Sequence, residues 1–418
     1  MKFIAHLVYK NIDEQKKMWY HCVVTLVTRG NDVMLIKNAH ILTMEDKEYE
    51  NGYIITDGTK IKEVGDMSQL KDENSFDEVY DAKGNYALPG FVEAHCHIGL
   101  WAYGHGSEGI DGNESTDPVT PHLRGIDSID PSDKSFEKAL KAGVTTVVTG
   151  PGSANIIGGQ FAALKTTGRW VDEMIIKAPV AMKAALGENP KKTYGGRNVS
   201  PKTRMASAAV LREALFKARE YVRKHDEYNS GESKSRPERD FKMEALSEVI
   251  RKNLVLKVHA HRADDICTAI RIAEEFDIRI TIEHCTEGHL IADLIKEKNI
   301  PVMLGPTFGV SGKPETKNKS YEVYCAMEKA GVPFAIISDH DVLPVEELPL
   351  LASIAHKNGV GKDACLRAIT INAAKNTGID DRVGSIKAGK DADIVIISGE
   401  LLTLDTKVEA VFINGKQA

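Results

Sequence analysis

The sequence predicts an α/β protein, a (β/α)8 TIM barrel with a small composite β-sandwich domain built from both chain ends. Two observations lead to this fold class. Apolar strand-like runs alternate with helical patterns through the middle of the chain, and short strands with glycine turns occur at both ends. The length of 418 residues is enough for one large domain and a smaller one.

The two ends of the chain have the same pattern. Residues 34–87 alternate apolar and polar positions and carry turn chemistry such as Asp57-Gly58. Residues 383–418 likewise contain short strand-like runs separated by glycine turns. Because β segments at opposite ends of a chain commonly pair, we predict one sandwich domain from 34–87 plus 383–418. Residues 1–33 precede the first of these strands and are predicted to be a peripheral appendage.

Residues 88–382 are predicted to form the barrel. Seven β-branched, apolar runs are typical of strands buried on both faces, and helical patterns separate them. The number of units favours a barrel over an open sheet, and neither GxGxxG nor GxxxxGK[ST] is present to indicate nucleotide binding. Residues 226–240 are polar and predict an exposed loop between two helices. The predicted strand regions are 88–100, 144–150, 174–186, 253–261, 278–285, 300–306 and 332–341.

Composition excludes several classes of protein. The net charge of −6 provides no basic surplus for binding nucleic acid. No apolar run reaches the ~18 residues that would span a membrane. The six cysteines form no CxxC pair, which fits reduced thiols in the cytoplasm. We therefore expect a cytoplasmic protein that binds neither nucleic acid nor a membrane.

The run LPGFVEAHCHIGL (88–100) contains the most informative spacing. His95 and His97 are alternate residues of a strand and therefore project to the same face. Together they can present two imidazoles to one metal ion. On this spacing alone, the alternative is one core histidine and one loop histidine.

Other predicted strands also end in potential ligands. Functional residues of a barrel sit at the C-terminal ends of its strands. Four separate strands here end in histidine or aspartate, which predicts a metal site. These residues are His95 and His97, His259 and His261, His284, and Asp339 with its neighbours His340 and Asp341.

These motifs resemble the amidohydrolase superfamily of metal-dependent hydrolases, in its imidazolonepropionase-like and prolidase-like branches. LPGFVEAHCH is similar to the opening strand, SDHD to the closing strand, and NAAKNTGIDDRVGSIKAGKDADIVII to the return from barrel to sandwich. The resemblance covers residues 34–418. It implies a metal-activated water that cleaves an amide-type C–N bond in a small-molecule substrate, which would be a cyclic amide, dipeptide or N-acyl compound. It also implies one or two divalent metals, expected to be zinc, and a homo-oligomer.

The resemblance assigns roles to the histidines. His95 and His97 would bind a metal in the more buried position, and His259 would be the ligand from the next histidine-bearing strand. His284 would be a ligand or a carbonyl polariser. His261 would face the substrate or make a hydrogen bond behind the ligands.

Asp339 is the expected general base. It would hold the attacking water, accept its proton and pass that proton to the leaving nitrogen. A carboxylate can do this near neutral pH because a metal lowers the pKa of bound water to about 7. His340 and Asp341 would orient Asp339 or cap the following turn.

The ligand from an internal strand is open between two residues. In related enzymes with two metals a carbamylated lysine bridges them, and Lys183 fits that role because a lysine at a buried strand end must lose its charge or find a partner. The segment containing Glu188 resembles the short glutamate segment of N-acetylhexosamine-phosphate deacetylases, and this favours Glu188 slightly. Alternatively, Lys183 is a solvated residue and Glu188 a turn residue before Pro190.

Three loops are candidates for lining the pocket. The glycine-rich stretch 150–161 could offer backbone N–H groups to a carboxylate. Residues 191–198 contain Tyr194 and Arg197, which could bind an anionic group. Residues 307–313 follow a later strand. Each of these could instead be purely structural.

Two other functions use the same scaffold. A deaminase or cyclic-imine hydrolase typically has glutamate three residues after the first histidine of the segment that begins at His259, but this chain has Arg262 there. A non-catalytic relative would have lost metal ligands, and this chain retains them.

Overall fold

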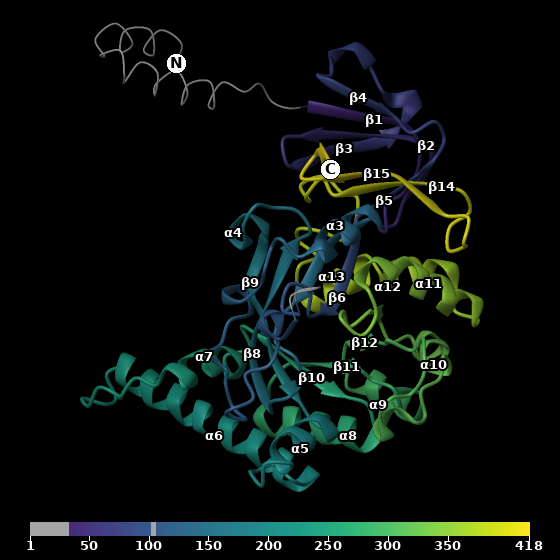
Figure 1. Ribbon diagram of the computed structural model, residues 1–418. Helices are drawn as coiled ribbons and strands as arrows, with labels where there is room; N and C mark the ends of the chain where they lie inside the picture. The colour runs from purple at the N-terminus through teal and green to yellow at the C-terminus, as the bar shows by residue number, and fades with distance from the viewer. Residues whose placement is uncertain (1–32, 102–105) are drawn as a thin grey trace, which may run out of the picture.

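The computed structural model describes residues 33–101 and 106–418. It is a mixed α/β fold in which a nearly closed eight-stranded barrel sheet adjoins a second, β-rich sheet (Figure 1). The predicted fold class is confirmed. The predicted appendage falls on residues 1–32, which lie outside the described residues. Within the described ranges, no helix combines the length and apolar character needed to cross a bilayer.

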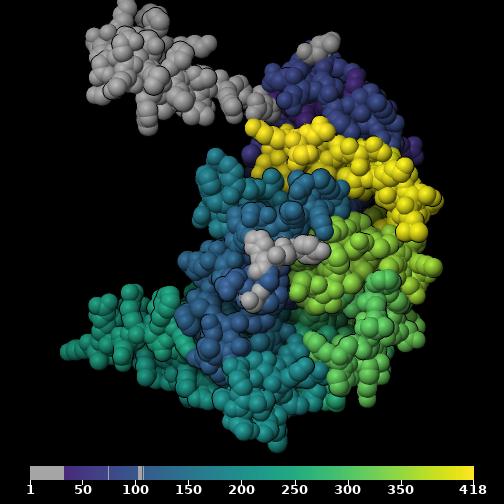
Figure 2. All heavy atoms as spheres, in the orientation of Figure 1, coloured from purple at the N-terminus to yellow at the C-terminus, as the bar shows by residue number. Residues whose placement is uncertain are grey.

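Strands from both chain ends form the β-rich sheet. The two ends meet where β5 and β14 pair antiparallel, with Leu88 opposite Val395. In Figure 2 the C-terminal segment, in yellow, lies directly against the N-terminal strands, in purple. The domain limits 34–87, 383–418 and 88–382 remain predictions. The strands are β1 (Val33–Leu42), β2 (Glu48–Asp57), β3 (Lys60–Asp66), β4 (Glu78–Asp81), β5 (Tyr86–Pro89), β14 (Ile394–Ser398), β15 (Lys407–Ile413) and β16 (Lys416–Gln417).

The barrel strands follow one another in chain order. The first and last approach closely, since the backbone N–H of Ser338, just after β13, donates to the Glu93 carboxylate of β6 at 2.8 Å. The strands are β6 (Phe91–Cys96), β7 (Val144–Thr149), β8 (Ile157–Lys165), β9 (Ile175–Ala185), β10 (Val255–Ala260), β11 (Ile280–His284), β12 (Val302–Leu304) and β13 (Phe334–Ile336).

One barrel strand was not predicted. The glycine-rich stretch 150–161 was expected to be a loop, but its end belongs to β8, which runs antiparallel to both β7 and β9. The strand pattern is not visible in the sequence because glycines occupy positions where the crowded backbone leaves no room for a side chain. A Cβ at Gly159 would lie 2.6 Å from the carbonyl oxygen of Leu123. The strand forms because the consecutive residues 161–164 bury apolar side chains on both of its faces.

Helices surround the barrel. The longest, α6, and α7 form an arm that projects from it (Figures 1 and 2). The loop between them is exposed over most of its length, as predicted, although α6 continues to Asn229. The helices are α3 (Lys134–Lys141), α4 (Val171–Met174), α5 (Glu188–Gly195), α6 (Arg204–Asn229), α7 (Phe241–Ile250), α8 (Ala263–Phe276), α9 (Ala292–Glu297), α10 (Glu322–Ala330), α11 (Leu348–Lys357), α12 (Lys362–Ala368) and α13 (Ile371–Thr377).

A buried ionic cluster joins the barrel to the second sheet. Asp391, 2% exposed, accepts a two-point contact from Arg382 at 2.8 Å for each bond. Lys165 of β8 lies 2.8 Å from the same carboxylate, and Lys60 of β3 lies 2.6 Å from it. Burial would raise the pKa of Asp391, but these three cations lower it below its ordinary range. The cluster therefore stabilises the junction in its charged form.

Candidate metal centre

The inside of the barrel is charged beneath the predicted site. Lys257 of β10 donates to Glu283 of β11 at 2.7 Å and to the carbonyl oxygen of Ala94 at 3.1 Å. All of these groups are buried. Glu283 Oε2 also lies 2.8 Å from His95 Nδ1. A buried carboxylate behind an imidazole is the usual arrangement at metal-binding histidines, where it fixes the ring orientation.

His95, His97 and Asp339 form one side of the site. The Nε2 atoms of His95 and His97 lie 3.6 Å and 3.4 Å from Asp339 Oδ1. Nδ1 of His97 lies 2.7 Å from the carbonyl oxygen of Gly150. In both rings Nδ1 therefore has an acceptor behind it, and Nε2 faces the carboxylate. Ligands at about 2.1 Å from a tetrahedral zinc are separated by roughly 3.4 Å, so this spacing fits a shared ion.

The other side contains three histidines. His284 Nδ1 lies 2.9 Å from the carbonyl oxygen of Gly305, and His261 Nδ1 lies 2.7 Å from the hydroxyl of Thr286. His259 Nδ1, unlike Nδ1 of His284 and His261, is buried without a hydrogen-bond partner; His95 Nδ1 also makes no hydrogen bond, although Glu283 Oε2 lies 2.8 Å from it. His259 Nδ1 is therefore free to bind a metal. The structure brings together two sets of potential ligand atoms, each within 4.8 Å, which share His284: His259, His261 and His284, and His95, His284 and Asp339.

The structure distinguishes the two internal-strand candidates. Lys183 of β9 is fully buried, and its Nζ lies 3.1 Å from His95 Nε2. It is therefore not a solvated residue. Glu188 begins α5, and its carboxylate accepts the backbone N–H of Glu315 at 3.1 Å. Glu188 belongs to neither set of clustered ligand atoms among the described residues.

The electrostatics suit metal ligands. Burial lowers the pKa of His259 and of His284 well below the ordinary value, and lowers that of His261 to about 4. Burial alone would raise the pKa of Asp339, but His284, His97 and Lys183 lower it to about 2. Burial also lowers the pKa of Lys183, to about 8. Near neutral pH His259, His261 and His284 are therefore neutral imidazoles, and Asp339 is an ionised carboxylate.

The segment after β13 adopts an unusual backbone. Asp339 has φ 53° and His284 has φ 70°, a left-handed conformation that is uncommon outside glycine and occurs often at functional sites. His340 is buried, and its Nδ1 accepts the backbone N–H of Val345 at 3.2 Å. His340 therefore caps the following turn, one of the two roles predicted for it, while Asp341 is exposed.

The predicted lining residues Tyr194 and Arg197 are engaged within the protein. The buried Tyr194 hydroxyl donates to Asn155 Oδ1 at 2.5 Å, and Arg197 donates to the carbonyl oxygen of Ser115 at 2.6 Å. Residues 191–195 of the predicted lining loop 191–198 are helical instead and form the end of α5, and these contacts tie that helix end to neighbouring loops.

Three residues at the site were not predicted. Glu283 lies behind the His95 ring, with its Oε2 2.8 Å from His95 Nδ1. Asn189 Nδ2 lies 3.5 Å from His259 Nε2, and Glu315 Oε1 lies 3.6 Å from that same nitrogen. A charge inside the apolar run ITIEH could have indicated Glu283. Nothing in the loop sequence around Glu315 distinguishes it from solvated acids.

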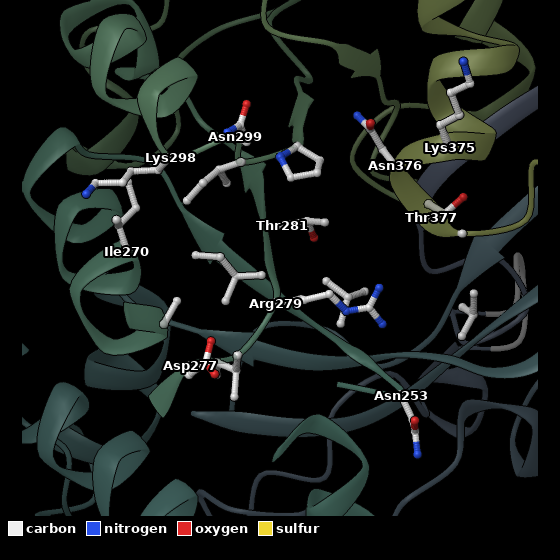
Figure 3. Close-up of a pocket in the computed structure, with 18 of the residues that line it drawn as sticks. Asn253, Ile270, Asp277, Arg279, Thr281, Lys298, Asn299, Lys375, Asn376 and Thr377 are labelled. Carbon is white, nitrogen blue, oxygen red and sulfur yellow. The ribbon is translucent and has the colours of Figure 1, made fainter. Parts of the chain in front are cut away.

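A separate cavity lies at the other end of the barrel (Figure 3). It is lined by residues at the starts of β10, β11 and β12, including Asn253, Arg279 and Asn299. It contains none of the predicted metal ligands. The predicted ligands lie instead at the C-terminal ends of the strands, the end at which barrel enzymes carry their active sites.

The chain is similar to several known proteins. The chain is 29% identical over 434 residues to the amidohydrolase tasK of Hapsidospora irregularis, covering 92% of this chain but only 43% of that protein. It is 27% identical over 379 residues to an imidazolonepropionase of Caldanaerobacter subterraneus subsp. tengcongensis, covering 84% and 85%.

Solved structures have the same fold. A crystal structure of an amidohydrolase from Thermotoga maritima MSB8 has a TM-score of 0.87 and 41% identity, covering 92% of this chain and 99% of that one. A prolidase complexed with N-methylphosphonate-L-proline has a TM-score of 0.56 at 19% identity, over 92% and 99%, and shows the fold alone. Residues 86–418 match the amidohydrolase family description. With that match over most of its length, the chain belongs to the amidohydrolase family.

Proposed function

We propose that the protein is a metal-dependent hydrolase that cleaves an amide-type C–N bond with water, in a cyclic amide, a dipeptide or an N-acyl compound. One observation carries the proposal. Buried imidazoles from three strands and the carboxylate of Asp339 converge, and each imidazole keeps one nitrogen clear of the groups that fix the other.

His95, His97 and Asp339 would hold one zinc ion, and His259 and His284 would hold a second. Nitrogen and oxygen donors at these spacings suit zinc. When bound, zinc lowers the pKa of its water to about 7 and polarises a carbonyl. The buried, unpartnered Nδ1 of His259 supports a site built for a cation.

Lys183, rather than Glu188, is our choice for the group between the two ions. Its amine is fully buried beside His95 Nε2, at the centre of the cluster. Reaction of the neutral Nζ amine with carbon dioxide would form an N–C bond, release one proton and leave a carbamate, whose oxygens would serve as metal ligands. Glu188 is instead hydrogen-bonded to the Glu315 backbone.

Asp339 would be the proton carrier. Its carboxylate is ionised near neutral pH and lies within 4.0 Å of His95, His97 and His284. It would accept a proton from the water that adds to the carbonyl carbon. It would then give that proton to the leaving nitrogen as the C–N bond breaks.

Roles for His284 and His261 complete the proposed assignment of the site residues. His284, with Nδ1 held by the Gly305 carbonyl, presents Nε2 as a ligand. His261 is held by Thr286 and would orient the substrate carbonyl. The arrangement disfavours a deaminase, because Arg262 is paired with Asp264 at 2.8 Å on the exposed side of the loop.

The setting of the protein is also proposed. The five cysteines in the described ranges are free, which supports a reducing, cytoplasmic compartment. Assembly as a homo-oligomer remains a prediction from the family resemblance.

The function is tested with metal-free protein reloaded with zinc. We expect the reloaded protein to cleave at least one of three substrate classes: N-acyl amino acids, dipeptides or cyclic amides. Asp339→Asn should lower kcat by about 10²–10⁴-fold, as loss of a general base does. Release of ammonia from adenosine derivatives, with no cleavage of any amide, would contradict the proposal in favour of a deaminase.

A further inference from the structure

Glu315 is a buried carboxylate on an otherwise exposed loop. It lies in the short 3-10 helix Pro314–Thr316, between β12 and α10, and is 2% exposed. Its Oε2 accepts the backbone N–H of Glu188 at 2.8 Å, and Glu188 Oε2 accepts the backbone N–H of Glu315 at 3.1 Å. These reciprocal bonds fix the direction of the Glu315 side chain.

The second oxygen of Glu315 faces the histidines. Oε1 is buried without a hydrogen-bond partner, and lies 3.6 Å from His259 Nε2 and 3.7 Å from His261 Nε2. An unpaired buried carboxylate oxygen is costly. The position of Glu315 Oε1 near the two imidazole nitrogens therefore suggests a role for this oxygen in the metal site.

The ring of His259 supplies that explanation. A neutral imidazole carries hydrogen on one nitrogen and a lone pair on the other. Nδ1 has no protein partner and is the atom assigned to the metal, so Nε2 carries the hydrogen. Asn189 Nδ2 also lies 3.5 Å from Nε2, but an amide nitrogen only donates hydrogen bonds and cannot accept Nε2–H. The remaining acceptor facing Nε2–H is Glu315 Oε1.

We propose that Glu315 is a positioning residue for the metal centre, an inference that rests on the proposed function. When a metal is bound at Nδ1, Glu315 Oε1, which lies 3.6 Å from His259 Nε2 in this structure, would accept the Nε2–H and so direct the Nδ1 lone pair of that ring toward the metal. A carboxylate behind a ligand histidine orients the ring and raises its basicity. Glu315 would then do for His259 what Glu283 does for His95, but from a loop instead of a strand.

The backbone leaves space for this contact. Gly187 has φ +84°, and a Cβ there would lie 2.5 Å from Glu315 Oε2. Because Gly187, the residue immediately before α5, has no side chain, the Glu315 carboxylate fits between its own loop and the start of α5. The space is specific to Glu315, since the other nearby atom, Asp265 Oδ2, would be 3.5 Å from that Cβ.

The test is the zinc affinity of metal-free protein, for wild type, Glu315→Gln and Glu287→Gln. Glu315→Gln should weaken binding of one zinc equivalent by about 10–100-fold. Glu287→Gln is the matched control. Glu287 is also a buried loop carboxylate, but its oxygens are satisfied by the backbone N–H of Ala263 at 2.9 Å and by Asn318 at 2.7 Å. The Glu287→Gln variant should bind both zinc equivalents with wild-type affinity.

Several results would overturn the inference. Wild-type zinc affinity in Glu315→Gln would remove the positioning role and leave the proposed function standing. A zinc-loaded crystal structure with a Glu315 oxygen about 2.0–2.2 Å from the ion would make it a ligand instead. No zinc affinity in wild type would contradict the proposed function and the inference together. Should Glu315→Gln fail to fold, Gly187→Ala displaces the same carboxylate and must weaken zinc binding.

Discussion

His95 Nδ1 lies 2.8 Å from Glu283 Oε2, and both side chains are fully buried. The same oxygen lies 2.7 Å from Lys257 Nζ. One carboxylate therefore balances a buried cation and orients an imidazole whose other nitrogen faces Asp339. The stability of the barrel interior and the geometry of the metal centre thus share one residue.

Glu283→Gln should lower both stability and zinc affinity. Removing one partner of a buried ion pair leaves Lys257 uncompensated, so we expect the free energy of unfolding to fall by about 3–5 kcal/mol. Zinc affinity should fall by about 10–100-fold because His95 loses its orienting carboxylate. Urea denaturation and zinc titration measure the two effects separately.

The double variant Lys257→Met/Glu283→Gln separates the two roles of Glu283. Removing the stranded cation should recover part of the lost stability without restoring zinc affinity. If affinity recovers along with stability, the orienting role of Glu283 is wrong and its effect is purely structural.

Gly187→Ala and Gly309→Ala form a matched pair on the loops. Both glycines have positive φ, +84° and +85°, so alanine should destabilise the protein at each position. The loss should be larger at Gly187, because its ψ of −146° places it in a backbone region essentially restricted to glycine. Only at Gly187 would the new Cβ meet Glu315; at Gly309 nothing lies within 4 Å. Zinc titration should show weakened binding for Gly187→Ala alone. Equal affinities in the two variants would argue against the role of Glu315.

Zinc loading should depend on bicarbonate through Lys183. Metal-free wild type reconstituted in buffer free of carbon dioxide should bind less zinc than with bicarbonate, because the carbamate cannot form. Lys183→Arg should show no such dependence, and intact mass should show the added carbon dioxide only where Lys183 is present. Full zinc loading of wild type without carbon dioxide would contradict the bridging role.

Asp391→Asn should destabilise the protein in a pH-dependent way. The folded-state pKa of Asp391 is lowered below its unfolded value of about 3.9, so its contribution is present above that pH and is lost as the pH falls. We expect the difference in unfolding free energy between wild type and Asp391→Asn to be largest near neutral pH and to shrink in acid. Urea denaturation at a series of pH values measures this.

The control for Asp391 is Asp127→Asn. Asp127 pairs with Arg124 on the surface, where both side chains are more than half exposed. Such a pair contributes about 0–1 kcal/mol, so little change is expected at any pH. A loss as large as that of Asp391→Asn would show that burial does not set the effect.

Patterns along strands allowed most of the fold and part of the site to be predicted. The two-residue spacing of His95 and His97, and ligands at successive strand ends, follow from strand periodicity. Strand β8 was missed because Gly158 and Gly159, which allow close backbone approach, remove the apolar alternation. Its antiparallel direction depends on pairing that local sequence does not encode.

Contacts between distant loops could not be predicted. Whether Lys183 or Glu188 lies among the predicted metal ligands depends on where β9 ends relative to α5. The partner of Glu188 is 127 residues away, on a loop whose acid looks like any solvated acid. The reciprocal hydrogen bonds between Glu188 and Glu315 join residues far apart in the sequence, and they exist only once the barrel has formed.

The zinc content per chain, measured by elemental analysis after reconstitution with zinc and bicarbonate, tests the central claim most directly. The arrangement of His95, His97, Asp339, His259, His284 and Lys183 predicts about two equivalents, as in two-metal hydrolytic sites. A folded protein that retains no zinc under these conditions would contradict the claim that this cluster is a metal centre.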